Sequence, residues 1–256
     1  MNKKVTGFSA LILAVVMMFL FCSCGIDTEE EVVKRASAIP QSKEEIFNYF
    51  DKAMKAVHEN DPAVSYNLSQ KARSPECENS DIKTIFPTIA EMMTGDKGDS
   101  TKYGEDCTVI FPENKLELND IRSANIIDID DPTSRSYTVV FTIWDESNPT
   151  QDDSTFGKLY KLTPKEEILE ELKKGASLIS VKDYEYEYQI GKITAVISKE
   201  TDRLSELKLE REVKVTTEVT GEGTLAQIGT VPLSFKYSST ANYSVDWDNP
   251  ETAEVE

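Results

Sequence analysis

The sequence predicts an α+β fold, in which a curved, mainly antiparallel β-sheet packs against N-terminal and central helices. Helical periodicity occurs before Gly175, whereas the chain after Gly175 alternates apolar and polar residues, as β-strands do. In the alternating segments one side of each strand is apolar and the other is charged. This pattern is typical of an antiparallel sheet with one face in water and helices on the other.

Three segments carry helical signals. Residues 42–60 open with a capping box and repeat apolar side chains at helical spacing. Residues 81–96 are a second candidate, and because Pro87 lies inside this segment, the helix is either kinked there or begins near Phe86. Residues 163–175 combine a threonine cap, a proline at the first helical position, and lysines and a glycine at the end, so a third helix is expected.

Strands are expected where β-branched and aromatic residues cluster between turn signals. Before the third helix the expected strands are residues 107–111, 124–130 and 136–144, and a long polar loop follows over residues 145–157. After the third helix the expected strands are residues 183–190, 192–198, 204–219, 224–228, 232–238 and 241–247.

The N-terminal segment has the pattern of an export signal. Two lysines precede an apolar run over residues 8–21, which is shorter than the roughly 20 residues of a membrane-spanning helix. Residues 21–24, Phe-Cys-Ser-Cys, resemble the lipobox of bacterial lipoproteins, in which a small residue precedes an invariant cysteine. The resemblance implies a diacylglycerol thioether on Cys24 and cleavage before it. An uncleaved short membrane helix is the alternative.

These features predict the organisation of the chain. Residues 1–23 are expected to be a lipoprotein signal peptide, residues 24–40 a tether, residues 41–248 a single α+β domain, and residues 249–256 a disordered tail. Acyl chains on Cys24 would hold the mature protein at a membrane, since two chains give stable anchoring. The expected location is therefore extracytoplasmic, anchored to the bacterial membrane.

The chain is strongly acidic, with 28 Lys and Arg against 46 Asp and Glu and a net charge of −18. Such a surface repels phosphates, so the sequence predicts no binding of nucleic acid. It also repels anionic lipid headgroups, so the lipid rather than the protein surface must provide the anchor. Solubility is one explanation of the charge, and recruitment of Ca2+ or a cationic partner is the other.

Two cysteines remain in the expected mature domain, Cys77 and Cys107, and both have polar neighbours. An extracytoplasmic compartment permits disulfides, so a bridge between them is possible. Such a bridge would close a loop that stabilises the fold by about 3 to 4 kcal/mol in the chain-entropy model. Two free thiols are the alternative.

The sequence contains little that indicates catalysis. His58 is the only histidine and falls in the last turn of the first helix, where a cation interacts favourably with the helix dipole. Carboxylates are dense over residues 128–131 and 145–153, which read as solvated loops, with weak calcium binding or a two-carboxylate glycosidase as alternatives. We therefore expect no enzymatic activity, no metal and no cofactor.

Two features suggest ligand binding. Tyr184, Tyr186 and Tyr188 share one strand face, where they form either core or an exposed aromatic platform for glycan or peptide. Arg211 falls in a row with Leu209 and Val213, and a charge there is costly unless it is paired or at an edge. Arg211 marks either a bulge or the sheet's rim, or a cavity with apolar walls whose one cation holds an anionic headgroup.

The lipobox, the helical N-terminal half and residues 193–215, "ITAVISKETDRLSELKLEREVKV", together resemble LolA/LppX-type envelope lipoproteins. Residues 39–46, "IPQSKEEI", also resemble the start of cell-envelope lipoproteins of Firmicutes. The first resemblance implies a curved antiparallel sheet that wraps helices, with a cavity that carries lipids or lipoproteins in some members. It carries over no functional residue.

Three functions follow from these observations. The first is a membrane-anchored extracytoplasmic lipoprotein that binds a lipid or other amphiphilic ligand in a cavity between sheet and helices. The second is a structural or interaction lipoprotein that contacts envelope components and holds no ligand. The third is a carboxylate-dependent hydrolase, for which two facing carboxylates in a cleft, one with a raised pKa, would be the sign.

Overall fold

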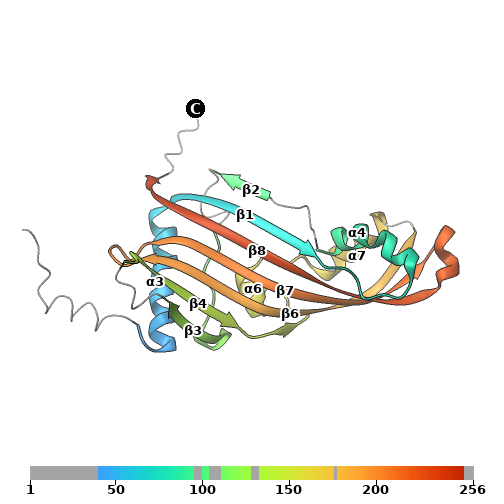
Figure 1. Cartoon of the computed structure of the whole chain (residues 1–256), viewed down its shortest axis with the longest axis horizontal. Coiled ribbons are helices and arrows are strands. Elements are labelled where there is room, and N and C mark those ends of the chain that lie inside the picture. Colours follow the sequence, from blue (N-terminus) through green and yellow to red (C-terminus); the bar gives the residue numbers. More distant parts are fainter. Residues whose placement is uncertain (1–39, 95–99, 104–110, 128–132, 176–177, 251–256) are drawn as a thin grey trace, which may run out of the picture. The chain divides into compact units, whose positions relative to one another are not determined.

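The computed structural model describes residues 40–94, 100–103, 111–127, 133–175 and 178–250 (Figure 1). The chain divides into two units, Met1–Gln41 and Ser42–Glu256, and the second contains every helix and strand described below. The expected signal peptide, most of the expected tether, Cys24, Cys107 and nearly all of the expected tail lie outside the described residues.

Helix α3 (Lys43–Asn60) begins and ends where the sequence predicts. The Ser42 hydroxyl accepts a hydrogen bond from the Glu45 N–H at 3.1 Å, and the Glu45 carboxylate accepts one from the Ser42 N–H at 3.0 Å. This capping box satisfies two backbone donors that the first turn cannot. Asp61, with φ of 47°, ends the helix in a left-handed conformation. The apolar stripe of α3, which includes Phe50 and Val57, is buried.

Two further helices match the expected segments, and a short helix lies in the expected polar loop. Helix α4 (Ser80–Thr94) starts before Pro87 and runs through it, and the Asn79 side chain accepts hydrogen bonds from the first N–H groups of the helix. Helix α7 (Lys165–Gly175) follows Pro164 as expected. Helix α6 (Thr155–Leu159) is capped by Ser154.

The strands form one antiparallel sheet, which confirms the predicted α+β class. Their order is β2-β1-β8-β7-β6-β4-β3, and β5 pairs with β6 (Figure 1). The strands are β1 (Pro62–Ala72), β2 (Ser100–Tyr103), β3 (Ile121–Ile127), β4 (Ser136–Ile143), β5 (Glu146–Ser147), β6 (Ile179–Ser198), β7 (Leu204–Gly221) and β8 (Thr230–Pro250).

Several local expectations were wrong. Residues 224–228 were expected to be a strand but belong to a 3-10 helix, η2 (Gly223–Ile228), which connects β7 to β8. The pairs of strands expected over residues 183–198 and 232–247 are single long strands, β6 and β8. The expected polar loop at residues 145–157 contains β5 and the start of α6. Strand β1 was not expected at all.

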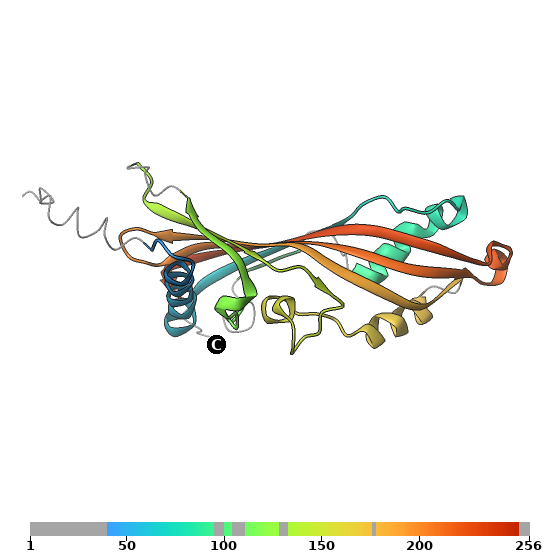
Figure 2. The same ribbon diagram turned by 90° about the horizontal axis from the view of Figure 1, so that it is seen from below.

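One face of the sheet carries the core. Phe50 of α3 packs on Phe141 of β4 with ring centroids 5.0 Å apart, and Phe86 of α4 packs on Phe235 of β8 at 5.1 Å. Through the cross-strand register, Phe141 and Phe235 align with Leu209 and Val215 of β7, which lie on the same face because their numbers differ by an even amount. Figure 2 likewise shows α3 and α7 on one side of the sheet.

Strand β6 contains two bulges that change which residues face the core. Val181 pairs with Val219 and Tyr184 with Thr217, so two residues of β6 lie opposite Glu218 alone. A second irregularity follows between Gln189 and Lys192. Inward-facing positions are therefore odd-numbered at the start of β6, even-numbered over Tyr184, Tyr186 and Tyr188, and odd-numbered again from Gly191 to Ile197.

Candidate functional site

Arg211 lies in the middle of the core face of the sheet. It sits on β7, a central strand, between Leu209 and Val213, which are 1% and 0% exposed. The residue is partly buried, but its Nε and Nη1 atoms are fully buried and have no hydrogen-bond partner in the described part of the chain. Arg211 therefore does not lie at the rim of the sheet, because β7 pairs with β6 on one side and β8 on the other.

The second bulge of β6 lies directly opposite Arg211. Gln189 pairs with Glu212 and Lys192 with Glu210, so Ile190 and Gly191 together face Arg211. The φ angle of Ile190 is 53°, a backbone conformation that β-branched residues rarely adopt. Its side chain is 64% exposed. A Cβ at Gly191 would lie 2.2 Å from the Ile143 side chain. The bulge thus turns one side chain outward and leaves a residue without a side chain beside Arg211, as bulges near functional sites do.

Two tyrosine rings contact the guanidinium group of Arg211. Its Cζ atom lies 4.3 Å from the ring centroid of Tyr160 and 5.3 Å from that of Tyr188. Tyr160 directly follows α6, and its ring stacks on Phe156 of that helix at 6.0 Å. Such cation–π contacts each contribute about 0.5 to 2 kcal/mol and leave the in-plane N–H groups of the guanidinium as donors.

A cavity of about 220 Å³ opens between the sheet and the helices at this point, and we call it the Arg211 cavity. Its sheet side includes Arg211, Tyr186, Tyr188 and Tyr237, and its other side is formed largely by Met92 and Met93 of α4, Leu162, and Ile168 of α7. The structure therefore brings Arg211, Tyr186 and Tyr188 together. Tyr184 does not line the cavity; its ring packs on Tyr186 at 4.6 Å and lies under the Lys165 ammonium.

The buried part of the Arg211 cavity combines the positive charge of Arg211 with neutral tyrosine hydroxyl groups, whereas Lys161 and Glu171 line it from exposed positions. Burial raises the pKa of Tyr160 and Tyr237 well above the usual value, although the Arg211 cation opposes this effect. Burial also raises the pKa of Tyr184 to about 12. For Arg211, burial acts to lower the pKa, but the surrounding tyrosines, Tyr237 first, outweigh it and the pKa is raised. The guanidinium is therefore charged and the phenols are protonated at neutral pH.

Unpartnered polar atoms gather around Arg211. Besides the two guanidinium nitrogens, the hydroxyl groups of Tyr160 and Ser239 are buried without a hydrogen-bond partner among the described residues. Ser239 of β8 is the cross-strand neighbour of Arg211, so both side chains are on the same face. An unsatisfied buried polar group costs about 1 to 3 kcal/mol, and more when it is charged. Of these three residues only Arg211 lines the Arg211 cavity, so it is the one that a ligand there can reach.

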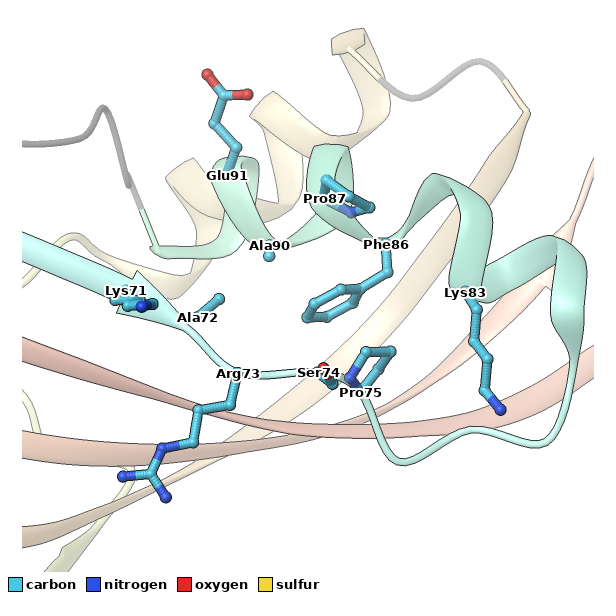
Figure 3. A pocket seen from close by; sticks show the side chains of 10 residues that line it. All are labelled: Lys71, Ala72, Arg73, Ser74, Pro75, Lys83, Phe86, Pro87, Ala90 and Glu91. Atoms are coloured by element: carbon cyan, nitrogen blue, oxygen red, sulfur yellow. The ribbon is translucent and has the colours of Figure 1, made fainter.

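Two other hollows are less suited to bind a small molecule. The larger, about 560 Å³, lies between the end of β1 and α4 (Figure 3). In Figure 3 the ring of Phe86 points into it, whereas the charged ends of Arg73 and Lys83 point away. A groove of about 330 Å³ on the charged face of the sheet is lined mostly by polar side chains, including Asn67 and Asn242. Neither presents a buried unpartnered charge.

The carboxylates and the histidine have structural contacts. Asp120 accepts hydrogen bonds from Lys158 at 2.8 Å and Thr155 at 3.1 Å, and although burial acts to raise its pKa, these bonds lower it. Glu146 accepts hydrogen bonds from the first N–H groups of α6. His58 Nε2 lies 3.2 Å from the Pro112 carbonyl. Among the residues that the structure describes, no three His, Cys, Asp or Glu side chains are arranged to hold a metal ion.

Compared with models of protein families, with curated proteins and with solved structures, the chain gives no match. In the described ranges no helix is long and apolar enough to cross a membrane. Cys77 forms no disulfide with another described residue, and because Cys107 lies outside the described residues, the bridge between them stays a prediction.

Several residues of the site were not identified from the sequence. Tyr160, Tyr237 and Ser239 belong to no motif, and the chain brings them to Arg211 only through the sheet register and α6. The bulge had a signal in the sequence, because an isolated glycine inside an alternating strand, here Gly191, indicates a bulge or a close approach of two chains.

Proposed function

We propose that this protein is an extracytoplasmic lipoprotein, anchored to the bacterial membrane through Cys24, that binds an amphiphilic ligand in the Arg211 cavity and catalyses no reaction. One observation carries the binding proposal: a buried guanidinium that has no acidic partner among the described residues forms part of the wall of a cavity between sheet and helices. The anchor rests on the signal-like N-terminal residues.

The two sides of the Arg211 cavity suit the two parts of an amphiphile. Arg211 and the tyrosine hydroxyls offer charge and hydrogen bonds to a polar headgroup. Across the cavity, Met92, Met93 and Ile168 offer apolar surface to a hydrocarbon chain. Each methylene group buried there contributes about 0.8 kcal/mol, and methionine side chains adapt readily to chains of different shape.

Native mass spectrometry tests the binding proposal. The chain from residue 24 onward, with Cys24→Ala, is purified from its own envelope and its mass is compared before and after organic extraction. We expect an extractable added mass that Arg211→Met greatly reduces. Arg203→Met is the matched control, because Arg203 also lies over an aromatic ring, that of Trp247 at 4.8 Å, but does not line the Arg211 cavity. A bare protein mass that no added lipid changes would contradict the proposal.

A second candidate function is an interaction lipoprotein that holds no small ligand. The hollow between β1 and α4 supports it, because Phe86 and Ala90 give it an apolar floor and its charged lining residues are Lys71, Arg73 and Lys83 against Glu91, in an otherwise acidic chain. Its partner would be an acidic segment with one apolar side chain. Photo-crosslinking from position 83 in the native envelope tests this idea, and loss of a specific crosslink in a Phe86→Asp variant is the expected result. If the crosslink is unchanged in that variant, this candidate is contradicted.

A further inference from the structure

The size of the Arg211 cavity restricts its ligand. At about 220 Å³ it is smaller than the cavities that usually bury a drug-sized ligand, which measure roughly 300 to 1,000 Å³. It has the volume of about seven liquid waters, each of which takes about 30 Å³. A small headgroup and the first few carbons of one chain fit this space, whereas a glycerol phosphate headgroup with two acyl chains does not.

The charges around the Arg211 cavity restrict the headgroup to a single negative charge. Arg211 is the buried cation. Lys161 and Glu171 also line the cavity, but both are exposed, so they lie at its mouth and their opposite charges offset each other. A second negative charge on the ligand would approach Glu171 with no further cation to balance it, and a cationic headgroup would be repelled by Arg211.

The hydrogen-bonding groups also point to an acceptor-only headgroup. The Arg211 guanidinium, which forms part of the cavity wall, can only donate hydrogen bonds. A carboxylate has two oxygens with about four lone-pair positions and no donor, so it can accept hydrogen bonds from the guanidinium and also neutralise its charge. An alcohol offers one oxygen and no charge, and would leave the guanidinium unneutralised.

We propose that the ligand of the Arg211 cavity is a single-chain amphiphile with a carboxylate head, of the fatty-acid class, whose carboxylate binds Arg211 while its first methylenes contact Met92, Met93 and Ile168. This inference rests on the proposed function and narrows it. Arg211 supplies the charge, and Gly191 in the bulge opposite it lets the side chains of Ile143 and Phe156 pack where a Cβ would lie.

Isothermal titration of the full chain in phosphatidylcholine nanodiscs tests the inference, with empty nanodiscs as the blank. The probes share one chain length and differ in headgroup: octanoate, octyl phosphate, octanol and octylammonium. We expect octanoate to bind at least tenfold more tightly than the other three. Arg211→Met should weaken octanoate at least tenfold and change octanol by less than twofold, whereas Arg203→Met should match the wild type.

Two milder variants keep the test valid if Arg211→Met does not fold. Arg211→Gln removes the charge but keeps polar donors and should weaken octanoate about tenfold, whereas Arg211→Lys keeps the charge and should weaken it by less than fivefold. Octyl phosphate binding more tightly than octanoate would overturn the carboxylate class. Equal binding of octanol and octanoate would overturn the inference but leave amphiphile binding intact. Failure of all probes, together with a diacyl lipid in the native mass spectrum, would overturn only the inference, and failure of both experiments would overturn the proposed function as well.

Discussion

Arg211 and Glu212 are neighbours on β7, are both buried to a large extent, and lie on opposite faces of the sheet. Glu212 is 8% exposed, and its carboxylate oxygens form ion pairs with Arg73 and Lys236, each at 2.8 Å. Arg211 has two tyrosine rings and no carboxylate among the described residues. The charge of Glu212 is neutralised within the fold, whereas that of Arg211 is not.

The difference separates a structural charge from a candidate functional one. The burial of a charge needs no ligand to explain it when its ion pair is complete within the protein, since each charge compensates the desolvation of the other. A buried charge without a partner costs stability, so it needs another explanation, and a cavity at its side supplies one. Substitutions at and around these two residues can test the distinction.

Gly191→Val tests whether the bulge opposite Arg211 must carry a residue without a side chain. A Cβ at this position meets the Ile143 side chain at 2.2 Å and the Phe156 ring at 2.9 Å. We expect the free energy of unfolding to fall by about 3 kcal/mol, as overpacked cores do. Urea unfolding measures this change, and Ile190→Val in the same bulge, at an exposed side chain, is the control. A variant as stable as the wild type would show that the bulge places no tight limit on packing.

Glu212→Gln removes the charge that both Arg73 and Lys236 contact. We expect a loss of about 2 kcal/mol, because hydrogen bonds to charged groups contribute about 1.5 to 3 kcal/mol and both cations are partly exposed and can turn to water. Thermal or urea unfolding measures the loss, and Glu210→Gln, on the same strand face, is the comparison. An unchanged stability would mean that the ion pairs of Glu212 do not differ from ordinary surface pairs.

Arg211→Met should not lower the free energy of unfolding, whereas Glu212→Gln should lower it. Without ligand, replacing an unpaired buried cation by an apolar side chain of similar length should leave the protein as stable or more stable by about 1 kcal/mol. Urea unfolding of ligand-free protein measures this effect alongside the loss of binding. If Arg211→Met instead destabilises the protein by several kcal/mol, the cation–π contacts hold the core together and Arg211 is structural.

Asp120 is a partly buried carboxylate that accepts hydrogen bonds from Lys158, Thr155 and the Glu117 N–H, and its expected effect on stability is the smallest of the four substitutions. Its pKa lies below the ordinary value of 3.8 in the folded state, so the unfolded chain binds more protons there. The stability that Asp120 contributes is present above that value and is lost as the pH falls through the lowered pKa. Between about pH 5 and pH 3, the free energy of unfolding should therefore depend less on pH in Asp120→Asn than in the wild type. Equal slopes of the free energy of unfolding against pH in the two proteins would contradict the lowered pKa of Asp120.

The sequence predicted the elements whose own residues determine them. Helix α3 has its capping box and apolar stripe in one segment, and β7 alternates apolar and polar residues over most of its length, so both were predicted correctly. Strand β1 was missed because its outward residues are small and polar and only a few apolar side chains, such as Val64, mark its inward face. Residues 224–228 were wrongly assigned because five β-compatible residues can also form a 3-10 turn when the strands on each side of them must reverse direction.

The candidate site was predicted only in part for a related reason. Arg211 was recognisable because its charge breaks an apolar row along a single strand. Its surroundings depend on register between strands and on the path of the chain around α6, which local patterns do not specify. Tyr160 and Ser239 therefore come together with Arg211 only in the folded structure.

The two bulges of β6 also restrict how this chain can evolve. Between them, Tyr184, Tyr186 and Tyr188 face the core while Glu185 and Glu187 face the solvent. Inserting or deleting one residue in this segment would reverse that order and bury two carboxylates against the helices. Changes of two residues would preserve it. We therefore expect length variation among relatives of this chain to occur in even steps between the bulges, a rule that can be checked in any set of related sequences.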